Sequence, residues 1–112
     1  MSKPAARSLS RHGREACELL GHLIHAARLE RSMTVAEVAE RAGVSRGLVH
    51  RIENGDAGCS IGAVFEIATI VGVQLFEAEP HTLTRHVAAV RDKLTLLPKA
   101  ARARAGALND DF

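Results

Sequence analysis

The sequence predicts a small all-α protein, and two observations carry this prediction. The chain has 112 residues, which is enough for one compact domain with terminal extensions. Hydrophobic residues make up 46% of it but aromatic residues only 3%. A core of this composition has to be assembled from Ala, Val, Ile and Leu side chains on packed helices.

Charge is distributed unevenly along the chain, although the formal net charge is only +2. Residues 1–31 contain six basic and three acidic side chains, residues 32–80 contain three and seven, and residues 81–112 contain six and three. The middle of the chain is therefore acidic. A nucleic acid would have to be bound there by a local basic face, not by a general attraction to phosphate.

The residues present do not support catalysis or metal binding. No nucleophile with its base and no pair of carboxylates in a cleft can be assembled, so no enzyme is expected. His22 and His25 lie three residues apart but have no third ligand at suitable spacing, so neither a metal nor another cofactor is expected. Cys17 and Cys59 have no CxxC spacing and are expected to be reduced, structural thiols.

The sequence also has no segment that favours a membrane or an export route. No apolar run approaches the roughly 20 residues that cross a bilayer, and the N-terminus does not resemble a secretory signal. We therefore expect a cytoplasmic protein with no membrane partner.

The order of the expected segments follows from their apolar spacing. Residues 1–13 are polar and basic, and from about Arg14 to Arg31 apolar residues recur at helical spacing. We expect a flexible arm over residues 1–13, the main domain over 14–79, an amphipathic helix for contact with a second copy or a partner over 80–98, and a flexible tail over 99–112.

Local signals predict two short helices in the first half of the chain. Thr34 and Glu37 have the spacing of a capping box, which begins a helix at the next residue. Gly43 should end that helix, because glycine adopts the left-handed conformation that follows a helix without a steric clash. Ser45 can cap the next helix, which should run to Asn54.

The second half of the chain predicts two further helices. Ser60 caps the first of them and Gly72 ends it, after which residues 73–79 alternate as a short strand or an extended segment would. From Thr82 to Leu97 apolar residues at four-three-four-three spacing form a narrow stripe that is suited to packing on another helix. The stripe consists of Leu83, Val87, Val90, Leu94 and Leu97.

The two short helices have the pattern of a DNA-reading motif. Ala39 is the small residue that two crossing helices need. The seam between them would be buried by Val38, Val49 and Ile52. The outward positions of the second helix then hold long hydrogen-bond donors and a glycine, namely Arg46, Gly47, His50 and Arg51. Arginine can donate two hydrogen bonds to guanine in the major groove, and glycine lets the helix lie close to the bases. The alternative is an ordinary helical hairpin without a nucleic-acid role.

The segment from about Leu20 to Val73 resembles the Xre/Cro-like helix-turn-helix repressor family, most specifically in the string AGVSRGLVHRIENG. The resemblance implies a lambda-repressor-like domain of five helices, followed here by an additional C-terminal amphipathic helix and a tail. It also implies a homodimer that represses transcription from a double-stranded DNA operator. The residue roles that it carries over are base contacts at Arg46, Gly47, His50 and Arg51, phosphate contacts at Thr34, Ser45 and Asn54, and a buried ion pair between Arg28 and Glu53.

One residue departs from the family's pattern. The family often has glutamine at the first position of the first short helix, where it bridges a phosphate and a base-reading side chain, but this chain has Val35. One phosphate contact is therefore lost. We expect moderate affinity for a single half-site and dependence on dimerisation.

Within that family, the string from Leu19 to Phe76 resembles antitoxins of HipB type, which repress their own operon and neutralise a kinase toxin. The resemblance implies a protein toxin of HipA type as a partner, with the C-terminal residues Asp110, Asp111 and Phe112 placed to dock in a toxin pocket. The alternatives are a tail without a role, and a stand-alone or restriction-modification controlling regulator that has no toxin partner.

Overall fold

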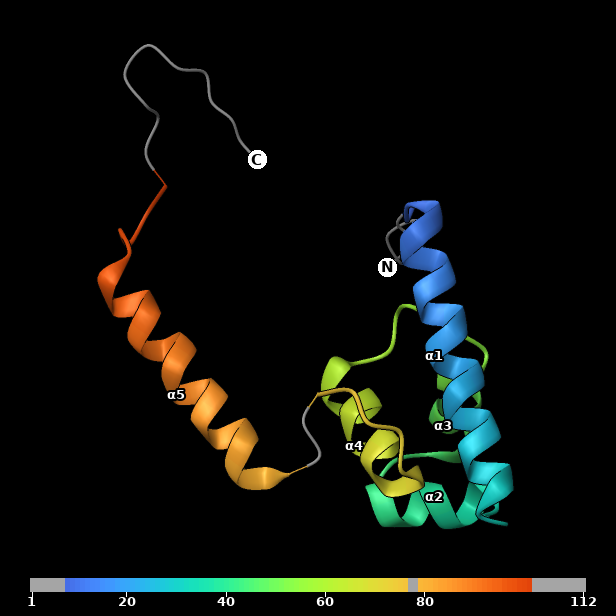
Figure 1. Cartoon of the computed structure of the whole chain (residues 1–112). Helices are drawn as coiled ribbons and strands as arrows, with labels where there is room; N and C mark the ends of the chain where they lie inside the picture. Colours follow the sequence, from blue (N-terminus) through green and yellow to red (C-terminus); the bar gives the residue numbers. More distant parts are fainter. Residues whose placement is uncertain (1–7, 77–78, 102–112) are drawn as a thin grey trace. The chain divides into compact units, whose positions relative to one another are not determined.

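The structure is a computed structural model that describes residues 8–76 and 79–101 (Figure 1). These ranges contain five α-helices and no strand, so the predicted all-α fold class is confirmed. The helices are α1 (Arg11–Glu30), α2 (Val35–Ala42), α3 (Arg46–Glu53), α4 (Ile61–Val71) and α5 (Pro80–Leu96). The chain divides into two units, Met1–Leu75 with α1 to α4 and Phe76–Phe112 with α5.

Helices α2, α3 and α4 begin where the sequence predicts them. Thr34 and Glu37 form a complete capping box, in which Oγ1 of Thr34 accepts from the backbone N–H of Glu37 at 3.0 Å. Oε1 of Glu37 accepts in return from the backbone N–H of Thr34 at 2.8 Å. Ser45 and Ser60 cap α3 and α4 through their hydroxyl oxygens.

Helix α1 begins earlier than the apolar spacing indicates. Oγ of Ser10 accepts from the backbone N–H of Gly13 at 3.0 Å, so Ser10 is the N-cap and α1 starts at Arg11 instead of near Arg14. The first turn lies outside the apolar pattern because its residues pack against no core side chain. Residues 11–13, expected in the flexible arm, are therefore helical.

The segment after α4 is not a strand in its described residues, 73–76 and 79, so the strand, one of the two predicted alternatives, is wrong there. Gly72 has a φ of 89°, and the backbone N–H of Val73 donates to the carbonyl oxygen of Ala68 at 2.8 Å, which closes α4 with a turn. The alternating pattern instead reflects the packing of Val73 and Leu75 against the core.

Over its described residues, 8–75, the first unit has four helices, one fewer than the resemblance implies for the domain. The fifth described helix, α5, is the expected C-terminal amphipathic helix. It has no buried residue, and the side chains of its stripe are exposed by 40% at Leu83 to 63% at Leu94. Within the described ranges, no helix has the length and apolar character that crossing a membrane requires.

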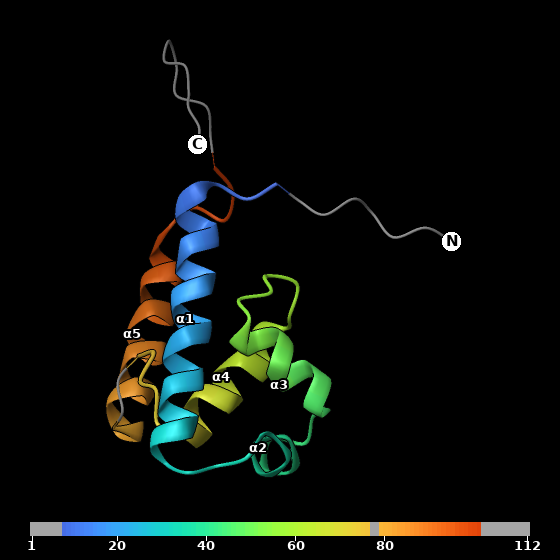
Figure 2. The ribbon, with the colours of Figure 1, turned by 90° about the vertical axis from the view of Figure 1, so that its right-hand side faces the viewer.

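All four helices of the first unit contribute to its core. Figures 1 and 2 both show α2 at the lower end of this unit, and α2 and α4 are in contact. The largest fully buried side chains are aliphatic, as the composition predicts, and are Ile24, Val38, Val49, Ile67 and Val71.

Helices α1 and α3 approach each other closely at Gly21, which the sequence interpretation did not single out. Gly21 is buried, and a Cβ atom there would lie 2.6 Å from the carbonyl oxygen of Ile52. The missing side chain thus lets α1 lie directly against the end of α3. The sequence did hold a signal for this approach, because an isolated glycine inside a helical pattern often marks a site of close packing.

Candidate nucleic-acid interface

The turn between α2 and α3 is closed by backbone hydrogen bonds around Gly43. Gly43 has a φ of 70°, which is strained for residues with a side chain, and its N–H donates to the carbonyl oxygen of Glu40 at 3.2 Å. The N–H of Val44 donates to the carbonyl oxygen of Ala39 at 3.0 Å. This turn fixes the direction in which α3 leaves α2.

One side of α3 is buried and the other is exposed. Val49, Ile52 and Glu53 are 0%, 4% and 5% exposed. Figure 2 shows α3 at the edge of the first unit, where no other helix of that unit covers its outer side. The four residues that the sequence predicts to face the bases are all exposed there, namely Arg46, Gly47, His50 and Arg51.

The nitrogen-bearing side chains on this side of α3 differ in how they are held. Among the described residues, Arg46 and His50 have no side-chain hydrogen bond or ion pair. In contrast, Nε of Arg51 donates to Oδ2 of Asp56 at 2.9 Å, while the Arg51 side chain stays 53% exposed. This hydrogen bond and the negative charge of Asp56 raise the pKa of Arg51. Arg46 is thus free to reach a ligand, whereas the protein orients Arg51.

The three residues that the resemblance relates to phosphate are exposed and lie at helix ends. Thr34 precedes α2 and Ser45 precedes α3, and each hydroxyl oxygen accepts a capping hydrogen bond. Each O–H therefore remains a donor. Asn54 follows α3, roughly 13 Å from Ser45 by the rise of an α-helix. Donors at both ends of α3 suit the holding of a phosphate backbone on either side of the bases that α3 would face.

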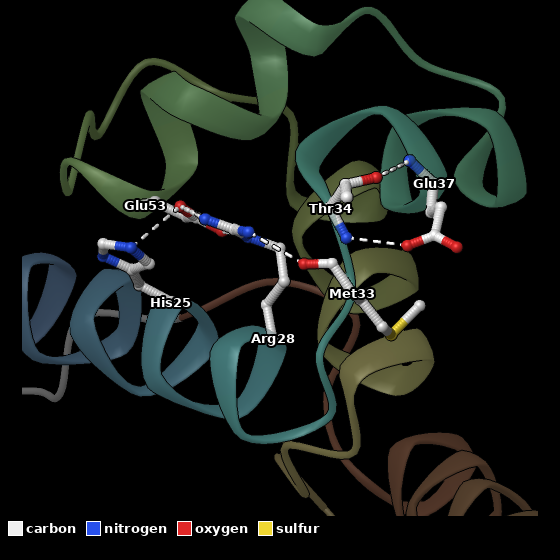
Figure 3. Close-up of polar contacts among 6 residues, drawn as sticks. All are labelled: His25, Arg28, Met33, Thr34, Glu37 and Glu53. Carbon is white, nitrogen blue, oxygen red and sulfur yellow. Dashed lines mark hydrogen bonds and ion pairs between the residues drawn. The ribbon is translucent and has the colours of Figure 1, made fainter.

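Behind α3, Arg28 of α1 and Glu53 are the two residues that the resemblance pairs, and they are in direct contact (Figure 3). Nε of Arg28 donates to Oε2 of Glu53 at 2.6 Å, and Nη2 donates to Oε1 at 3.1 Å. The hydrogen bond to Glu53 raises the pKa of Arg28, against the opposing effect of burial.

Two further contacts around this pair were not found by sequence reasoning. Nη1 of Arg28 donates to the carbonyl oxygen of Met33 at 2.9 Å, just before α2 begins. Nε2 of His25 lies 3.9 Å from Oε1 of Glu53. Figure 3 shows these groups converging between α1, α3 and the start of α2, so one cluster ties together the helices that position the exposed side of α3.

The loop after α3 holds a residue that the sequence interpretation missed. Oδ1 of Asp56 accepts from the backbone N–H of Gly58 at 2.8 Å, and the N–H of Asp56 donates to the carbonyl oxygen of Arg51 at 3.0 Å. The pKa of the neighbouring Cys59 thiol is raised, mainly by burial. The positive charge of Arg51 lowers this pKa and the negative charge of Asp56 raises it. An aspartate five residues after an arginine is a weak sequence signal, because the contact depends on the loop conformation.

The predicted partner-binding residues Asp110, Asp111 and Phe112 lie outside the described residues.

Comparison with known proteins supports the same part of the chain. The family model described as a helix-turn-helix domain matches residues 19–80, which is more than half of the chain. No curated protein matches the sequence. Helix-turn-helix domains bind DNA by placing their second helix in the major groove, and this indicates a DNA-binding regulator. With α2, the turn at Gly43 and α3 inside the matched range, the chain belongs to the family of helix-turn-helix domains.

Proposed function

We propose that the protein is a cytoplasmic transcriptional repressor that binds a specific DNA operator as a homodimer. The observation that carries this proposal is the exposed side of α3, where two guanidinium groups and an imidazole flank a glycine. Helix α3 enters the major groove, and Arg46 and Arg51 donate to the O6 and N7 acceptors of guanine. His50 adds a donor or acceptor for a base edge, and Gly47 allows the backbone of α3 to approach the base pairs closely.

Phosphate contacts hold the domain in register on the duplex. Thr34 and Ser45 donate from the starts of α2 and α3, and Asn54 donates from the end of α3. Val35 supplies no polar contact, and residues 32–80 have an excess of acidic side chains. A single domain is therefore held weakly, and two domains on a dyad-symmetric site give the required affinity. The exposed apolar stripe of α5 is the surface that a contact between two subunits would bury.

The test begins with selection of binding sites from a random duplex library. We expect two half-sites in dyad symmetry, about one helical turn or roughly 34 Å apart. Affinity should fall steeply with salt, because each Lys or Arg that neutralises a phosphate releases a counterion.

Two matched variants then separate base reading from general attraction. Arg46→Ala should reduce the preference for the selected duplex over random DNA by about tenfold. Arg85→Ala removes the same charge from α5, where the Arg85 side chain donates a hydrogen bond to Thr82, and should leave that preference unchanged. Equal preference in the Arg46→Ala variant and the wild type would refute the base-reading role.

A second function, neutralisation of a protein toxin of HipA type, is favoured by the charges beside the α5 stripe. His86 and Lys93 each precede a stripe residue, and Arg91 follows one, so both borders of the stripe can be positively charged. Pairing of two such stripes between subunits brings like charges together, whereas an apolar surface with acidic borders complements them, so a toxin with such a surface would compete with the subunit contact for this stripe. On this proposal the protein is the autoregulating antitoxin of its operon, with Asp110, Asp111 and Phe112 in the toxin contact.

The toxin-binding proposal is tested with a kinase-like toxin encoded beside this gene. The full chain should capture the purified toxin, and a chain ending at Leu97, which keeps the α5 stripe but lacks the tail, should capture it more weakly while still binding the selected duplex. Capture of equal strength after the truncation would exclude the tail as a docking element. A gene without such a neighbour, or one beside a methyltransferase, would favour the stand-alone or restriction-modification controlling regulator.

A further inference from the structure

The ion pair between Arg51 and Asp56 connects the exposed side of α3 to the loop that follows it. The carboxylate of Asp56 is itself fixed, because Oδ1 accepts from the N–H of Gly58 at 2.8 Å. The backbone of Asp56 is fixed as well, because its N–H donates to the carbonyl oxygen of Arg51 at 3.0 Å. Asp56 therefore presents Oδ2 to Arg51 from a defined position relative to α3.

The geometry of this pair leaves the end of the guanidinium group open. Asp56 accepts from Nε of Arg51 at 2.9 Å. Among the described residues, no partner occupies Nη1 or Nη2, and 53% of the Arg51 side chain is exposed. Two parallel N–H donors at the end of an arginine match the O6 and N7 acceptors of a guanine.

We propose that Asp56 is a positioning residue that holds Arg51 with Nη1 and Nη2 directed at a guanine, and that it thereby sets the base preference at that position. This inference rests on the proposed DNA-binding function. An arginine that is oriented before binding loses less side-chain freedom on binding than one that is free in solvent. Asp56 should therefore strengthen specific binding, although its negative charge opposes the approach of phosphate.

Asp56 thus has two opposite effects on DNA affinity: it strengthens specific binding by orienting Arg51, and its negative charge weakens binding to any DNA. This difference makes the proposal testable. Asp56→Asn removes the charge but keeps a side-chain oxygen for the N–H of Gly58 and leaves the backbone N–H of Asp56 in place. Specific binding should weaken because Arg51 is no longer oriented. Non-specific binding should stay the same or strengthen, because one negative charge near the DNA is lost.

The experiment compares the full-length wild type with the variants Asp56→Asn, Arg51→Lys and the double variant. Each is used to select duplexes from a random library, and each is titrated with the wild-type site and with random DNA. The matched control is Glu40→Gln, which removes one negative charge from an exposed α2 side chain that has no side-chain partner among the described residues. Circular dichroism and the thermal midpoint show whether each variant is folded.

Asp56→Asn should lower the ratio of specific to non-specific affinity by about tenfold. It should also relax the preference for guanine at the same position that Arg51→Lys relaxes. Because the two residues act as one unit, the double variant should lose no more than Arg51→Lys alone. Glu40→Gln should leave the base preference unchanged.

Three results would overturn the inference while the proposed function stands. They are an unchanged base preference in Asp56→Asn, an equal fall of specific and non-specific affinity, and losses that add in the double variant. A wild type that selects no sequence from the library would instead refute the proposed function itself.

Discussion

Arg28 of α1 and Glu53 of α3 form a buried ion pair with two hydrogen bonds, in which the side chains are only 9% and 5% exposed. The remaining nitrogen of Arg28, Nη1, donates to the carbonyl oxygen of Met33 at 2.9 Å. The guanidinium group thus joins α1, the end of α3 and the residue before the cap of α2. The direction of α3, and with it the exposed face, depends on this cluster.

Breaking this pair from one side should destabilise the fold strongly. Glu53→Gln should lower the free energy of unfolding by about 3 kcal/mol, because it leaves the positive charge of Arg28 buried without its partner. Urea unfolding at neutral pH measures this change. The double variant Arg28→Met with Glu53→Leu should recover most of the loss, since apolar side chains of similar volume need no partner.

An exposed ion pair of the same kind is the control for this prediction. Arg11 and Glu15 lie 3.3 Å apart with side chains 84% and 63% exposed. Glu15→Gln should change the free energy of unfolding by less than about 0.5 kcal/mol. A loss in Glu53→Gln as small as that in Glu15→Gln would show that burial adds nothing to the Arg28–Glu53 contact.

The close contact of α1 and α3 at Gly21 predicts that an alanine is not tolerated there. A Cβ atom would lie 2.6 Å from the carbonyl oxygen of Ile52 and 2.7 Å from that of Glu53. Gly21→Ala should therefore lower the free energy of unfolding by about 1–3 kcal/mol, despite the higher helix propensity of alanine. Thermal unfolding measures this change in stability. The control is Gly62→Ala, where nothing lies within 4 Å of the added Cβ atom. A gain in stability at both positions would contradict the close approach.

The elements that the sequence predicted correctly depend on signals within a few residues. In each of them, the groups that interact lie only a few residues apart in the chain, so a short stretch of sequence is enough to predict the contact. These elements are the capping box of Thr34 and Glu37, the cap at Ser45 and the turn at Gly43. Of the two alternatives predicted for residues 73–79, a short strand or an extended segment, the strand is wrong for the described residues 73–76 and 79, because alternation shows which side chains are buried but not whether another strand is available for pairing.

In the candidate site, too, the features that depend on helical spacing were predictable from the sequence, and the contacts that depend on a loop or on distant residues were not. The outward direction of Arg46 and Arg51 follows from helical spacing once Val49 and Ile52 are placed inside. The contact of Asp56 with Arg51 depends on a loop conformation and a side-chain rotamer that no spacing determines. The Arg28–Glu53 pair spans 25 residues of sequence, so only the family resemblance connected the two.

At Gly47 we predict that alanine would stabilise the fold but weaken DNA binding. A Cβ atom there would meet only Oγ of Ser45, at 3.8 Å, which is ordinary contact. Gly47→Ala should therefore raise the free energy of unfolding by about 0.5 kcal/mol, because alanine has the higher helix propensity. It should also weaken binding to the selected duplex, because a methyl group would separate α3 from the bases. Gly62→Ala should raise stability without changing the affinity. Unchanged affinity in Gly47→Ala would show that this part of α3 does not approach the bases.

We predict that the alkylation of the Cys59 thiol depends on pH in a way that reflects the charges in the loop after α3. Burial, together with the charge of Asp56, raises the pKa of Cys59 more than the charge of Arg51 lowers it. The reactive thiolate should therefore form at higher pH than in a free peptide, since a raised thiol pKa keeps the group protonated as the pH rises. Alkylation with iodoacetamide, followed on the Cys59 peptide by mass spectrometry, should show a midpoint above that of a synthetic peptide of residues 56–62. Arg51→Gln should raise this midpoint further, because it removes a positive charge that favours the thiolate, and Asp56→Asn should lower it. If both variants shift the midpoint in the same direction, the three groups do not interact electrostatically as the loop geometry requires.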